Sequence, residues 1–445
     1  MAFHPAAALA DRIAAELAAR GHRALLVGGC VRDLLLGHEP RDYDIATSAR
    51  PEEVLSLFPT ARLVGAHFGV VLVRDQSAEV EVATFRSDHS YRDGRHPVAV
   101  EFESDPRQDV LRRDFTINGL LLDPATGEVL DFVGGREDLA ARYIRAIGDP
   151  GVRFAEDHLR MLRAVRFAAR LGFSIHPDTF EAIRRQHGRI ELISKERVRD
   201  EISRILTEGG ARRGFELLDA TGLLDDVLPE VAALKGVPQP PEFHPEGDVW
   251  IHTMMMLGGM REPSLTLALG VLLHDAGKPP TLRMADRIRF DEHAEVGAEM
   301  AVRILTRLRY PNDVIRTVET LVANHLRFKD VTRMRESTLK RFMRFERFEE
   351  HLELHRLDCA MSHGLLGNYE FVKQRLAEAP PEELKPPPLV TGHDLIAAGY
   401  TPGPAFSRML RSAEDAQLEG TVHNREEALA LVRSHFSPPD GAEVS

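Results

Sequence analysis

The sequence predicts an α+β protein with an α/β head at its N-terminus and a longer, almost purely helical remainder. From Leu25 to about Phe132, short apolar runs rich in β-branched residues, such as LLVGG, FGVVLV and VEVATF, alternate with helical patterns, which is typical of a mixed α/β domain. After Gly148-Asp149-Pro150, apolar residues recur at spacings of three and four in FAEDHLRMLRAVRFAARLGF and RVRDEISRILTEGG, a pattern that indicates amphipathic helices.

Two proline-rich stretches divide the helical part. Pro238-Gln239-Pro240-Pro241 and the run PPEELKPPP at residues 380–388 cannot continue a helix and tend to form extended spacers. The length of 445 residues suits about three domains. The change of pattern near Gly148 and the two proline-rich stretches set three boundaries. We therefore expect four segments, at residues 1–147, 148–240, 241–378 and 379–445.

Composition excludes several classes of protein. No stretch approaches the roughly 20 apolar residues of a membrane span, and the alanine-rich start carries Asp11, Arg12 and Glu16, which indicates an amphipathic helix and not a secretory signal. The only two cysteines, Cys30 and Cys359, lie far apart, so neither a disulfide framework nor a cysteine-rich zinc site is expected. We expect a cytoplasmic protein without membrane contact.

The charge distribution bears on nucleic-acid binding. The net charge of −12 has the wrong sign for a protein that coats nucleic acid with its whole surface. Between Arg153 and Arg213, however, 14 Lys and Arg stand against 9 Asp and Glu. This segment could face RNA phosphates, although solvated helix faces would give the same count.

A first candidate site begins where a predicted strand ends, in LLVGGCVRDLLLGHEPRDYDIAT. At Gly28-Gly29 the absent side chains allow a phosphate to approach backbone N–H groups, and Arg32 and Asp33 follow at the start of a helix. Such a turn is also common without any ligand.

Carboxylates follow this turn. Asp42 and Asp44 are two residues apart, so on a strand they share one face. Carboxylates stacked in this way repel one another unless divalent cations lie between them, an arrangement that holds a pair of Mg²⁺ ions over a triphosphate and an attacking hydroxyl. Glu81, on a neighbouring predicted strand, is a candidate third carboxylate that could activate the attacking 3′-hydroxyl. The pattern predicts nucleotidyl transfer.

The order of these residues resembles the polymerase-beta-like nucleotidyltransferase head of class II tRNA nucleotidyltransferases (CCA-adding enzymes) and bacterial poly(A) polymerases. The family pattern G-G-x-V-R-D followed by D-x-D is matched by Gly28, Gly29, Val31, Arg32, Asp33, Asp42 and Asp44.

A second motif continues the resemblance. Arg112-Arg113-Asp114-Phe115-Thr116-Ile117-Asn118 is similar to the family's R-R-D-x-x-x-N, which contacts the sugar and phosphates of the nucleotide. The residue types suit a ribonucleotide, because arginine presents a charged fork to phosphate oxygens and Asp and Asn accept from a ribose hydroxyl.

A third motif, Glu156-Asp157-His158-Leu159-Arg160, resembles E-D-x-x-R, in which an Asp and an Arg select the base of the incoming CTP or ATP. Asp157 and Arg160 are three residues apart and are expected on one helical face. An acidic acceptor and a forked donor suit the amino group and ring nitrogen of cytosine or adenine. Arg163 and Arg166 continue the spacing and are expected at the triphosphate, although either could be an ordinary surface arginine.

The segment SDHSYRDGRHPVAVEF is similar to the flexible loop of the same family, with Asp93, Gly94 and Arg95 intact. In this family the loop is shortened in enzymes that add only cytidine, so the resemblance implies that this protein can incorporate AMP.

A second candidate site follows in the helical part, where the pattern resembles an HD domain. The family pattern H…HD…D maps to His252, His274, Asp275 and Asp358, and His293 and His325 resemble the added ligands of two-metal members. Imidazoles and carboxylates bind Mg²⁺ or a divalent transition metal, and a bound water could then attack a phosphoester. Lys278 could hold the phosphate.

Together the motifs imply an enzyme that adds CMP and AMP from CTP and ATP to the 3′ end of tRNA with two Mg²⁺ ions, and whose HD site removes 2′,3′-cyclic or 2′-phosphates. The alternatives are an A-adding enzyme, a poly(A) polymerase, or an HD phosphohydrolase with an RNA-binding head. The expected roles are nucleotidyl transfer for residues 1–147, base selection and RNA binding for 148–240, hydrolysis for 241–378 and tRNA contact for 379–445. The pattern leaves the oligomeric state open.

Overall fold

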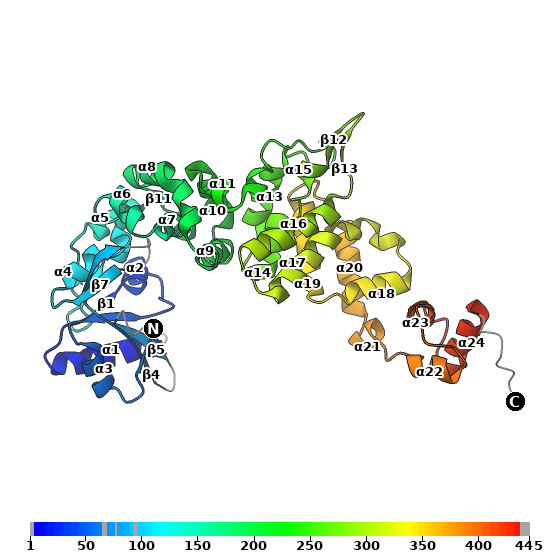
Figure 1. The fold of residues 1–445 in the computed structure, drawn as a ribbon, viewed down its shortest axis with the longest axis horizontal. Helices are drawn as coiled ribbons and strands as arrows, with labels where there is room; N and C mark the ends of the chain where they lie inside the picture. Colours follow the sequence, from blue (N-terminus) through cyan, green and yellow to red (C-terminus); the bar gives the residue numbers. More distant parts are fainter. Residues whose placement is uncertain (1–3, 65–68, 76–77, 92–96, 437–445) are drawn as a thin grey trace. The chain divides into compact units, whose positions relative to one another are not determined.

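A computed structural model of the chain describes residues 4–64, 69–75, 78–91 and 97–436. The chain divides into two compact units, the first comprising Met1–Ala232 with Arg307–Arg309 and the second Ala233–Thr306 with Tyr310–Ser445. Figure 1 shows the main strands in the N-terminal part of the first unit, and helices in the rest of the chain. The predicted α+β class is confirmed.

The N-terminal part of unit 1 is the predicted α/β head. Its helices are α1 (Pro5–Ala19), α2 (Gly29–Leu35), α3 (Pro51–Leu57), α4 (Pro106–Leu111) and α5 (Gly135–Ala141), with the 3₁₀ turn η1 (Thr116–Asn118). Its strands are β1 (Ala24–Val27), β2 (Asp44–Thr47), β3 (Arg62–Leu63), β4 (Val70–Arg74), β5 (Glu79–Thr84), β6 (Arg86–Tyr91), β7 (Pro97–Phe102), β8 (Leu121–Leu122), β9 (Val129–Leu130) and β10 (Tyr143–Ile144).

A mixed sheet organises the head. Its described strands run in the order β3-β4-β5-β2-β1-β8-β9, and β6 and β7 pair separately. β2 is parallel to β5, whereas β1 is antiparallel to β2 and β8. Because β-strand side chains alternate between two faces, one face can pack into a buried cluster, which consists of Leu25, Val27, Ala46, Phe85, Val110 and Leu121. This packing fixes β2, whose first residue is Asp44.

Helices dominate the rest of unit 1, as the apolar spacing predicts. They are α6 (Pro150–Glu156), α7 (Leu159–Leu171), α8 (Pro177–Gln186), α9 (Lys195–Thr207), α10 (Ala211–Thr221), α11 (Leu223–Val227) and α12 (Pro229–Ala232), with the 3₁₀ segment η2 (His187–Leu192). Asp149 caps α6 by accepting a hydrogen bond from the Val152 N–H, and Gly172 ends α7 at a φ of 65°. A short strand, β11 (Ser174–Ile175), pairs in parallel with β10, and the sequence analysis did not single it out.

Unit 2 is mainly helical in its described residues. Its helices are α13 (Val249–Gly259), α14 (Leu265–Leu273), α15 (Lys278–Thr281), α16 (His293–Arg307), α17 (Asn312–Asn324), α18 (Glu336–Met343), α19 (Phe348–Ala360), α20 (Gly367–Glu378), α21 (Pro381–Leu384), α22 (Gly392–Ala397), α23 (Ala405–Leu418) and α24 (Arg425–His435), with the 3₁₀ segment η3 (His325–Arg333). An antiparallel hairpin of β12 (Leu282–Met284) and β13 (Ile288–Phe290) interrupts them. The sequence analysis missed this hairpin, although apolar and polar residues alternate in each strand.

Both proline-rich stretches lie between longer helices, but they differ. Pro238 to Pro241 contains no helix, as expected. The second stretch was expected to form an extended spacer, but the short helix α21 forms inside it. Pro381 stands at the first position of α21, where a missing N–H costs nothing.

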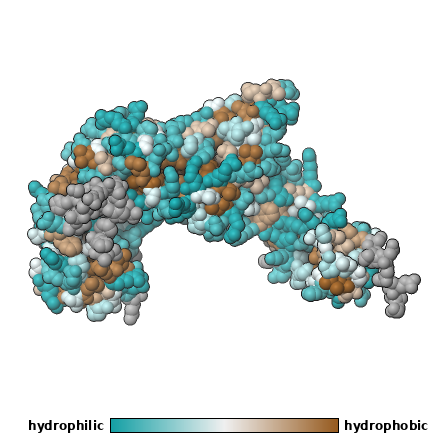
Figure 2. Space-filling view, in the orientation of Figure 1, coloured by the Kyte–Doolittle hydropathy of each residue, from teal (hydrophilic) through white to brown (hydrophobic). Residues whose placement is uncertain are grey.

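Cys30 and Cys359 are both buried and free. None of the described helices is long and apolar enough to cross a membrane. On the face shown in Figure 2, small groups of hydrophobic residues lie among hydrophilic ones.

Candidate active site and metal centre

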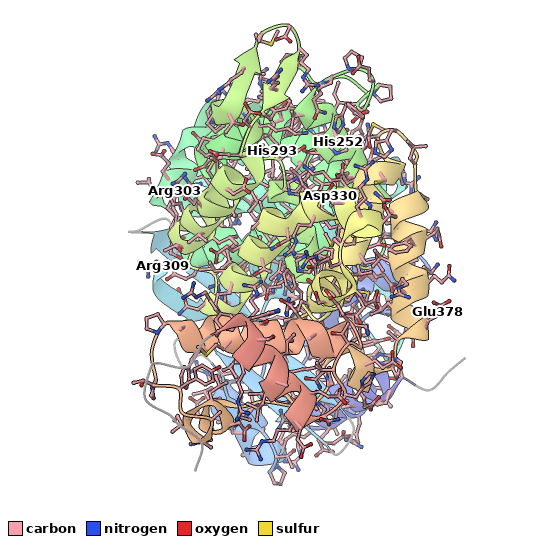
Figure 3. All side chains as sticks on the ribbon, turned by 90° about the vertical axis from the view of Figure 1, so that its right-hand side faces the viewer. His252, His293, Arg303, Arg309, Asp330 and Glu378 are labelled. Carbon is pink, nitrogen blue, oxygen red and sulfur yellow. The ribbon has the colours of Figure 1, made fainter. Side chains whose placement is uncertain are left out.

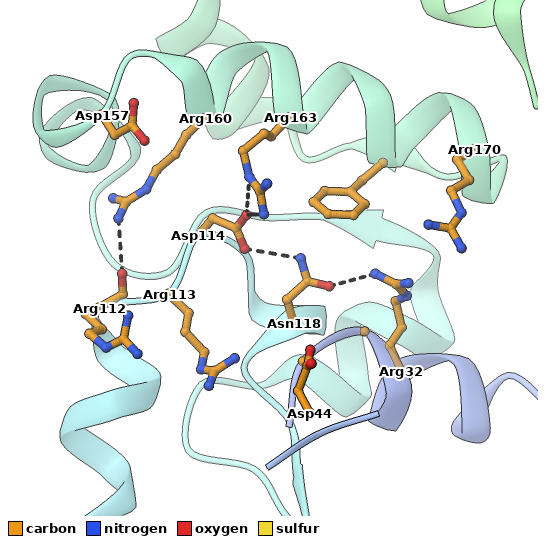
Figure 4. Close-up of a pocket in the computed structure, with 13 residues that line it drawn as sticks. Arg32, Asp44, Arg112, Arg113, Asp114, Asn118, Asp157, Arg160, Arg163 and Arg170 are labelled. Carbon is orange, nitrogen blue, oxygen red and sulfur yellow. Dashed lines mark hydrogen bonds and ion pairs between the residues drawn. The ribbon is translucent and has the colours of Figure 1, made fainter. Parts of the chain in front are cut away.

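A cavity of about 410 Å³ in unit 1 brings together residues from the three predicted head motifs. In Figure 4, side chains of α7 face Asp44, Asn118 and Arg32 across this cavity. Its lining consists of Gly28, Gly29, Arg32, Asp44, Arg112, Arg113, Asp114, Asn118, Asp157, Arg160, Arg163, Phe167 and Arg170.

Gly28 keeps one wall of the cavity open. Its φ of 73° and ψ of −130° are strained for any residue with a Cβ. An added Cβ would lie 3.4 Å from a guanidinium nitrogen of Arg113. The Gly28-Gly29 turn therefore leaves space in front of that guanidinium, as a phosphate site requires.

Three carboxylates lie near the start of β2, an interior strand of the sheet. Asp44 in β2 is the register partner of Glu81 in the parallel strand β5. Burial, and then the negative charges of Glu81 and Asp42, raise the pKa of Asp44 to about 6, although Arg113 acts against them. Asp42 and Glu81 are exposed and lie outside the cavity lining. The mutual repulsion and the all-oxygen donor set fit a site for Mg²⁺.

A hydrogen-bonded chain crosses the cavity from the head to α7. Arg32 donates to Asn118 Oδ1 at 2.8 Å, and the Asn118 amide donates to Asp114 at 3.1 Å. Arg163 of α7 donates to the other oxygen of Asp114 at 2.8 Å. Burial acts to raise the pKa of Asp114, but Arg163 and Asn118 outweigh it and lower the pKa to about 2. Asp114 therefore stays an acceptor.

Asp109, which the sequence analysis did not single out, holds the arginine pair of the second motif. Its fully buried carboxylate accepts from Arg112 at 2.6 and 2.9 Å and from Arg113 at 2.9 and 3.2 Å. The signal was present in the sequence, because an acid three and four residues before two arginines lies on their helical face.

The predicted base-selecting pair lies on the cavity, but not on one helix. Asp157 is at the break between α6 and α7 with extended backbone, at a φ of −147°, so the prediction of a shared helical face was wrong. Its carboxylate accepts from the Leu159 N–H at 3.1 Å, which ties it to the start of α7. Arg160 donates to Glu156 at 2.7 Å and to the Arg112 carbonyl at 3.1 Å.

Two further predicted residues do not reach the cavity. Arg166 is buried between Glu201 and Glu208, to which it donates at 2.7 and 3.1 Å. Arg166 is not part of the cavity lining. Asp33 is also outside the lining and accepts from Arg32 at 2.8 Å. The predicted loop residues Asp93, Gly94 and Arg95 lie outside the described residues.

The predicted HD ligands of unit 2 come together around Asp275. His293 Nε2 and His325 Nε2 lie 3.6 and 3.9 Å from Asp275 Oδ1, and His274 Nε2 lies 3.1 Å from Asp275 Oδ2. His252 Nε2 lies 3.1 Å from Asp358. Figure 3 labels His252 on α13 and His293 at the start of α16.

Backbone hydrogen bonds prepare three of these histidines as ligands. The Nδ1 atoms of His274, His293 and His325 lie 2.7 to 2.9 Å from the carbonyl oxygen three residues earlier. A carbonyl only accepts, so Nδ1 carries the proton and Nε2 keeps its lone pair. All three Nε2 atoms are buried without a hydrogen-bond partner. Burial and then His274 lower the pKa of His325 to about 3, which keeps its ring neutral.

Further residues support this cluster. Glu246 Oε1 lies 2.7 Å from His252 Nδ1. Burial acts to lower the pKa of His252, but Asp358 and Glu246 raise it to about 9. A positive charge is therefore favoured between these two carboxylates. Lys278 is buried and donates to Gln239 at 2.5 Å and lies 2.7 Å from Asp275. The sequence did not reveal Glu246 or Gln239, because both lie in loops without a spacing pattern.

A cavity of about 180 Å³ adjoins Asp275, Lys278, His293, His325 and Asp358. Nitrogen and carboxylate donors at these distances fit a divalent metal such as Mn²⁺, Fe²⁺, Ni²⁺ or Zn²⁺.

Three family models match the chain. The Poly A polymerase head domain matches residues 24–145, a "Probable RNA and SrmB-binding site of polymerase A" matches 172–235, and tRNA nucleotidyltransferase domain 2 matches 293–432.

Some curated relatives match about half of this chain, and others match nearly all of it. A CCA-adding enzyme of Geobacillus sp. (strain WCH70) is 45% identical over 203 residues, which cover 46% of this chain and 50% of that protein. The alignments with the first four relatives span about half of their length. The CCA-adding enzyme of Enterococcus faecalis is 33% identical over 93% of this chain and 92% of its own. A CC-adding tRNA nucleotidyltransferase of Thermus thermophilus is 35% identical over 92% of this chain and 93% of that protein.

Solved structures share the fold over nearly the whole chain. The Bacillus stearothermophilus CCA-adding enzyme in complex with CTP matches with a TM-score of 0.76 and 29% identity, over 97% of this chain and 98% of that one. The Thermotoga maritima CCA-adding enzyme complexed with tRNA matches with a TM-score of 0.61 and 21% identity, over 98% of this chain and 97% of that one.

Proposed function

Because this chain belongs to the class II tRNA nucleotidyltransferase and poly(A) polymerase family, we propose that it adds CMP and AMP from CTP and ATP to the 3′ end of tRNA. The observation that supports this most is that three separate motifs, Gly28-Gly29 with Asp44, Arg112 to Asn118, and Asp157 with Arg160, line one cavity. The similarity to the CTP-bound Bacillus stearothermophilus enzyme supports the nucleotide class.

The residues of the cavity divide the reaction between them. Asp42 and Asp44 would hold Mg²⁺, which when bound would supply positive charge that favours the ionised RNA 3′-hydroxyl and balances the charge of the departing pyrophosphate. The 3′-oxygen bonds to the α-phosphorus as the bond to the pyrophosphate oxygen breaks, and Glu81 accepts the hydroxyl proton. Arg112 and Arg113, held by Asp109, bind the phosphates.

The remaining residues orient the nucleotide. Asp114 and Asn118 accept from the ribose hydroxyls, and Arg163, which pairs with Asp114, contacts the phosphates. Asp157 accepts from the amino group of cytosine or adenine and Arg160 donates to the ring nitrogen. Uracil and guanine place a carbonyl where Asp157 needs a donor.

Transfer is tested with purified protein, Mg²⁺ and CTP and ATP, separately and together. The substrates are a tRNA without its three terminal nucleotides, a tRNA that ends in CC, and an unrelated RNA. Addition that stops at CCA supports the proposal, and an Asp44→Asn variant should abolish it. Addition of A to the CC-ending tRNA alone indicates an A-adding enzyme, and long A tails on any RNA indicate a poly(A) polymerase.

One of the curated relatives favours a further candidate activity, the addition of CC alone. The Thermus thermophilus relative is a CC-adding tRNA nucleotidyltransferase, so addition that stops at CC on the shortened tRNA would identify this activity instead. We favour AMP incorporation because the sequence retains Asp93, Gly94 and Arg95.

For the second centre we propose an HD phosphohydrolase that removes 2′,3′-cyclic or 2′-phosphates from RNA ends. His252, His274, Asp275, His293, His325 and Asp358 would hold a divalent transition metal or Mg²⁺. When bound there, the metal would supply a water of lowered pKa for attack on phosphorus. Lys278, at the adjoining cavity, would hold the phosphate.

Phosphatase assays on an RNA with a 2′,3′-cyclic phosphate test this proposal. His274→Ala should abolish hydrolysis, whereas His393→Ala, an exposed histidine of the same unit, should not. Equal activity in both variants would contradict the assignment. Hydrolysis without any nucleotide addition would favour the remaining alternative, a phosphohydrolase whose head only binds RNA.

These proposals give each segment a role in a cytoplasmic enzyme. Residues 1–147 transfer the nucleotide, 148–240 select the base and bind RNA, 241–378 hydrolyse phosphate esters and 379–445 contact tRNA. In the last segment, Pro404 precedes α23, whose N-terminal N–H groups could contact an RNA phosphate.

A further inference from the structure

The carboxylate of Asp157 is held by a residue that no predicted motif contains. Arg197 of α9 donates from its two terminal nitrogens to the two oxygens of Asp157, at 3.2 Å to Oδ1 and 2.8 Å to Oδ2. The Leu159 N–H adds a third hydrogen bond, to Oδ1 at 3.1 Å. Arg197 lies outside the cavity lining, whereas Asp157 is part of it.

This arrangement limits what Asp157 can accept. An ionised carboxylate has about four lone-pair sites, and three protein donors occupy three of them. Oδ1 accepts two hydrogen bonds and Oδ2 accepts one. One acceptor site therefore remains, on Oδ2.

The fork of Arg197 also fixes the plane of the carboxylate. Two parallel N–H···O bonds to one carboxylate prevent its rotation, which a single lysine ammonium does not. Asp157 has extended backbone outside α6 and α7, and its one hydrogen bond to a helix is the one it accepts from the Leu159 N–H. Without Arg197, only the Leu159 N–H would orient it.

We propose that Arg197 is a positioning residue that determines base specificity in nucleotide transfer, an inference that rests on the proposed function. It fixes Asp157 so that its free acceptor site meets the exocyclic amino group of cytosine or adenine. A uracil or guanine carbonyl at the same place meets a carboxylate that cannot turn away. Arg197 therefore contributes more to the rejection of keto bases than to the binding of amino bases.

The test compares CTP with UTP in wild type, Arg197→Gln and Arg197→Lys. We measure kcat/KM for the addition of one nucleotide to a tRNA that lacks its three terminal nucleotides. A hydrogen bond to a charged group corresponds to about a 10- to 100-fold effect, so we expect the CTP-to-UTP ratio to fall by about that factor in Arg197→Gln. Arg197→Lys keeps the charge without the fork and should give an intermediate ratio.

The matched control is Arg204→Gln, because Arg204 is an exposed residue of the same helix α9. This variant should keep the wild-type ratio. If Arg197→Gln lowered kcat/KM for CTP and UTP by equal factors, Arg197 would be merely structural and the inference would be wrong.

Equilibrium binding separates the inference from the proposed function. The ratio of Kd values for CTP and UTP is measured on the same variants without RNA, and it needs no transfer. A wild type that adds no nucleotide would contradict the proposed function alone, because the Kd ratio still tests Arg197. A thermal unfolding control shows whether the Arg197→Gln protein folds. If it does not fold, the ratio of Kd values for CTP and UTP in Arg197→Lys decides. A ratio equal to that of the wild type then overturns the inference.

Discussion

Asp109 offers the sharpest test of how the arginine pair is positioned. Its carboxylate is fully buried on α4 and accepts four hydrogen bonds from Arg112 and Arg113. Burial acts to raise the pKa of Asp109, but the two guanidinium groups outweigh it and hold the pKa below its ordinary value. The carboxylate is therefore charged at neutral pH. Asp109→Asn keeps the size of the side chain and removes this charge.

The expected loss follows from these contacts. The asparagine oxygen can still accept from one guanidinium, whereas its amide group faces the other with donor against donor. Removal of one partner from a buried ion pair costs about 3–5 kcal/mol. Since a domain has about 5–15 kcal/mol of stability, unit 1 should still fold. For a domain of this size, Tm should fall by roughly 6–20 °C.

Calorimetric unfolding and CTP titration measure both effects. Arg112 and Arg113 line the cavity, so their release should weaken CTP binding by about 10-fold or more. Glu137→Gln, an exposed acid of α5, is the control and should change neither quantity. If Asp109→Asn kept the wild-type Tm and Kd, the argument that Asp109 positions the arginine pair would be refuted.

Three further changes have defined outcomes. Glu246→Gln removes the carboxylate charge that lies 2.7 Å from His252 Nδ1, so Mn²⁺ affinity measured by calorimetry should fall about 10- to 100-fold, and an unchanged affinity would exclude this role. Burial, followed by the charge of Arg327, lowers the pKa of His351 from 6.5 to about 4, so the unfolded state binds the proton first as pH falls. Stability is complete above about pH 6.5 and should decline by about 1.4 kcal/mol per unit towards pH 4, and His351→Phe should flatten this slope in urea unfolding. Gly28→Ala should cost about 1–3 kcal/mol in the same assay because of its positive φ, and no loss would show that the turn relaxes.

Local patterns carried most of the prediction of the head. Gly28-Gly29 and Asp44 are close in sequence, and the strand, turn and helix around them follow from apolar runs and glycine positions. The sheet then brings Glu81 beside Asp44, as parallel pairing of β2 with β5 requires. The strand, turn and helix depend on residues within neighbouring elements, which sequence periodicity describes well, whereas the pairing of β2 with β5 reaches across α3, β3 and β4.

Partners from distant elements could not be predicted in this way. Arg163 and Arg166 have the same three-residue spacing, yet Arg163 pairs with Asp114 in the cavity while Glu201 of α9 holds Arg166 outside its lining. Spacing defines a helical face, but the charges packed against that face decide what each arginine contacts. The break before α7 was missed for a related reason, because Asp157 continues the helical pattern in sequence.

The pairings also explain how an acidic chain can hold a triphosphate. The net charge is −12, yet the cavity lining contains six arginines and three aspartates. Several carboxylates around this cavity orient arginines, as Asp109 does for Arg112 and Arg113 and Glu156 does for Arg160. An arginine held in this way loses little further freedom when a phosphate binds, so part of the entropic cost is met during folding. Part of the basic excess between Arg153 and Arg213 is paired in the same way within unit 1, as Arg166 is with Glu201 and Glu208.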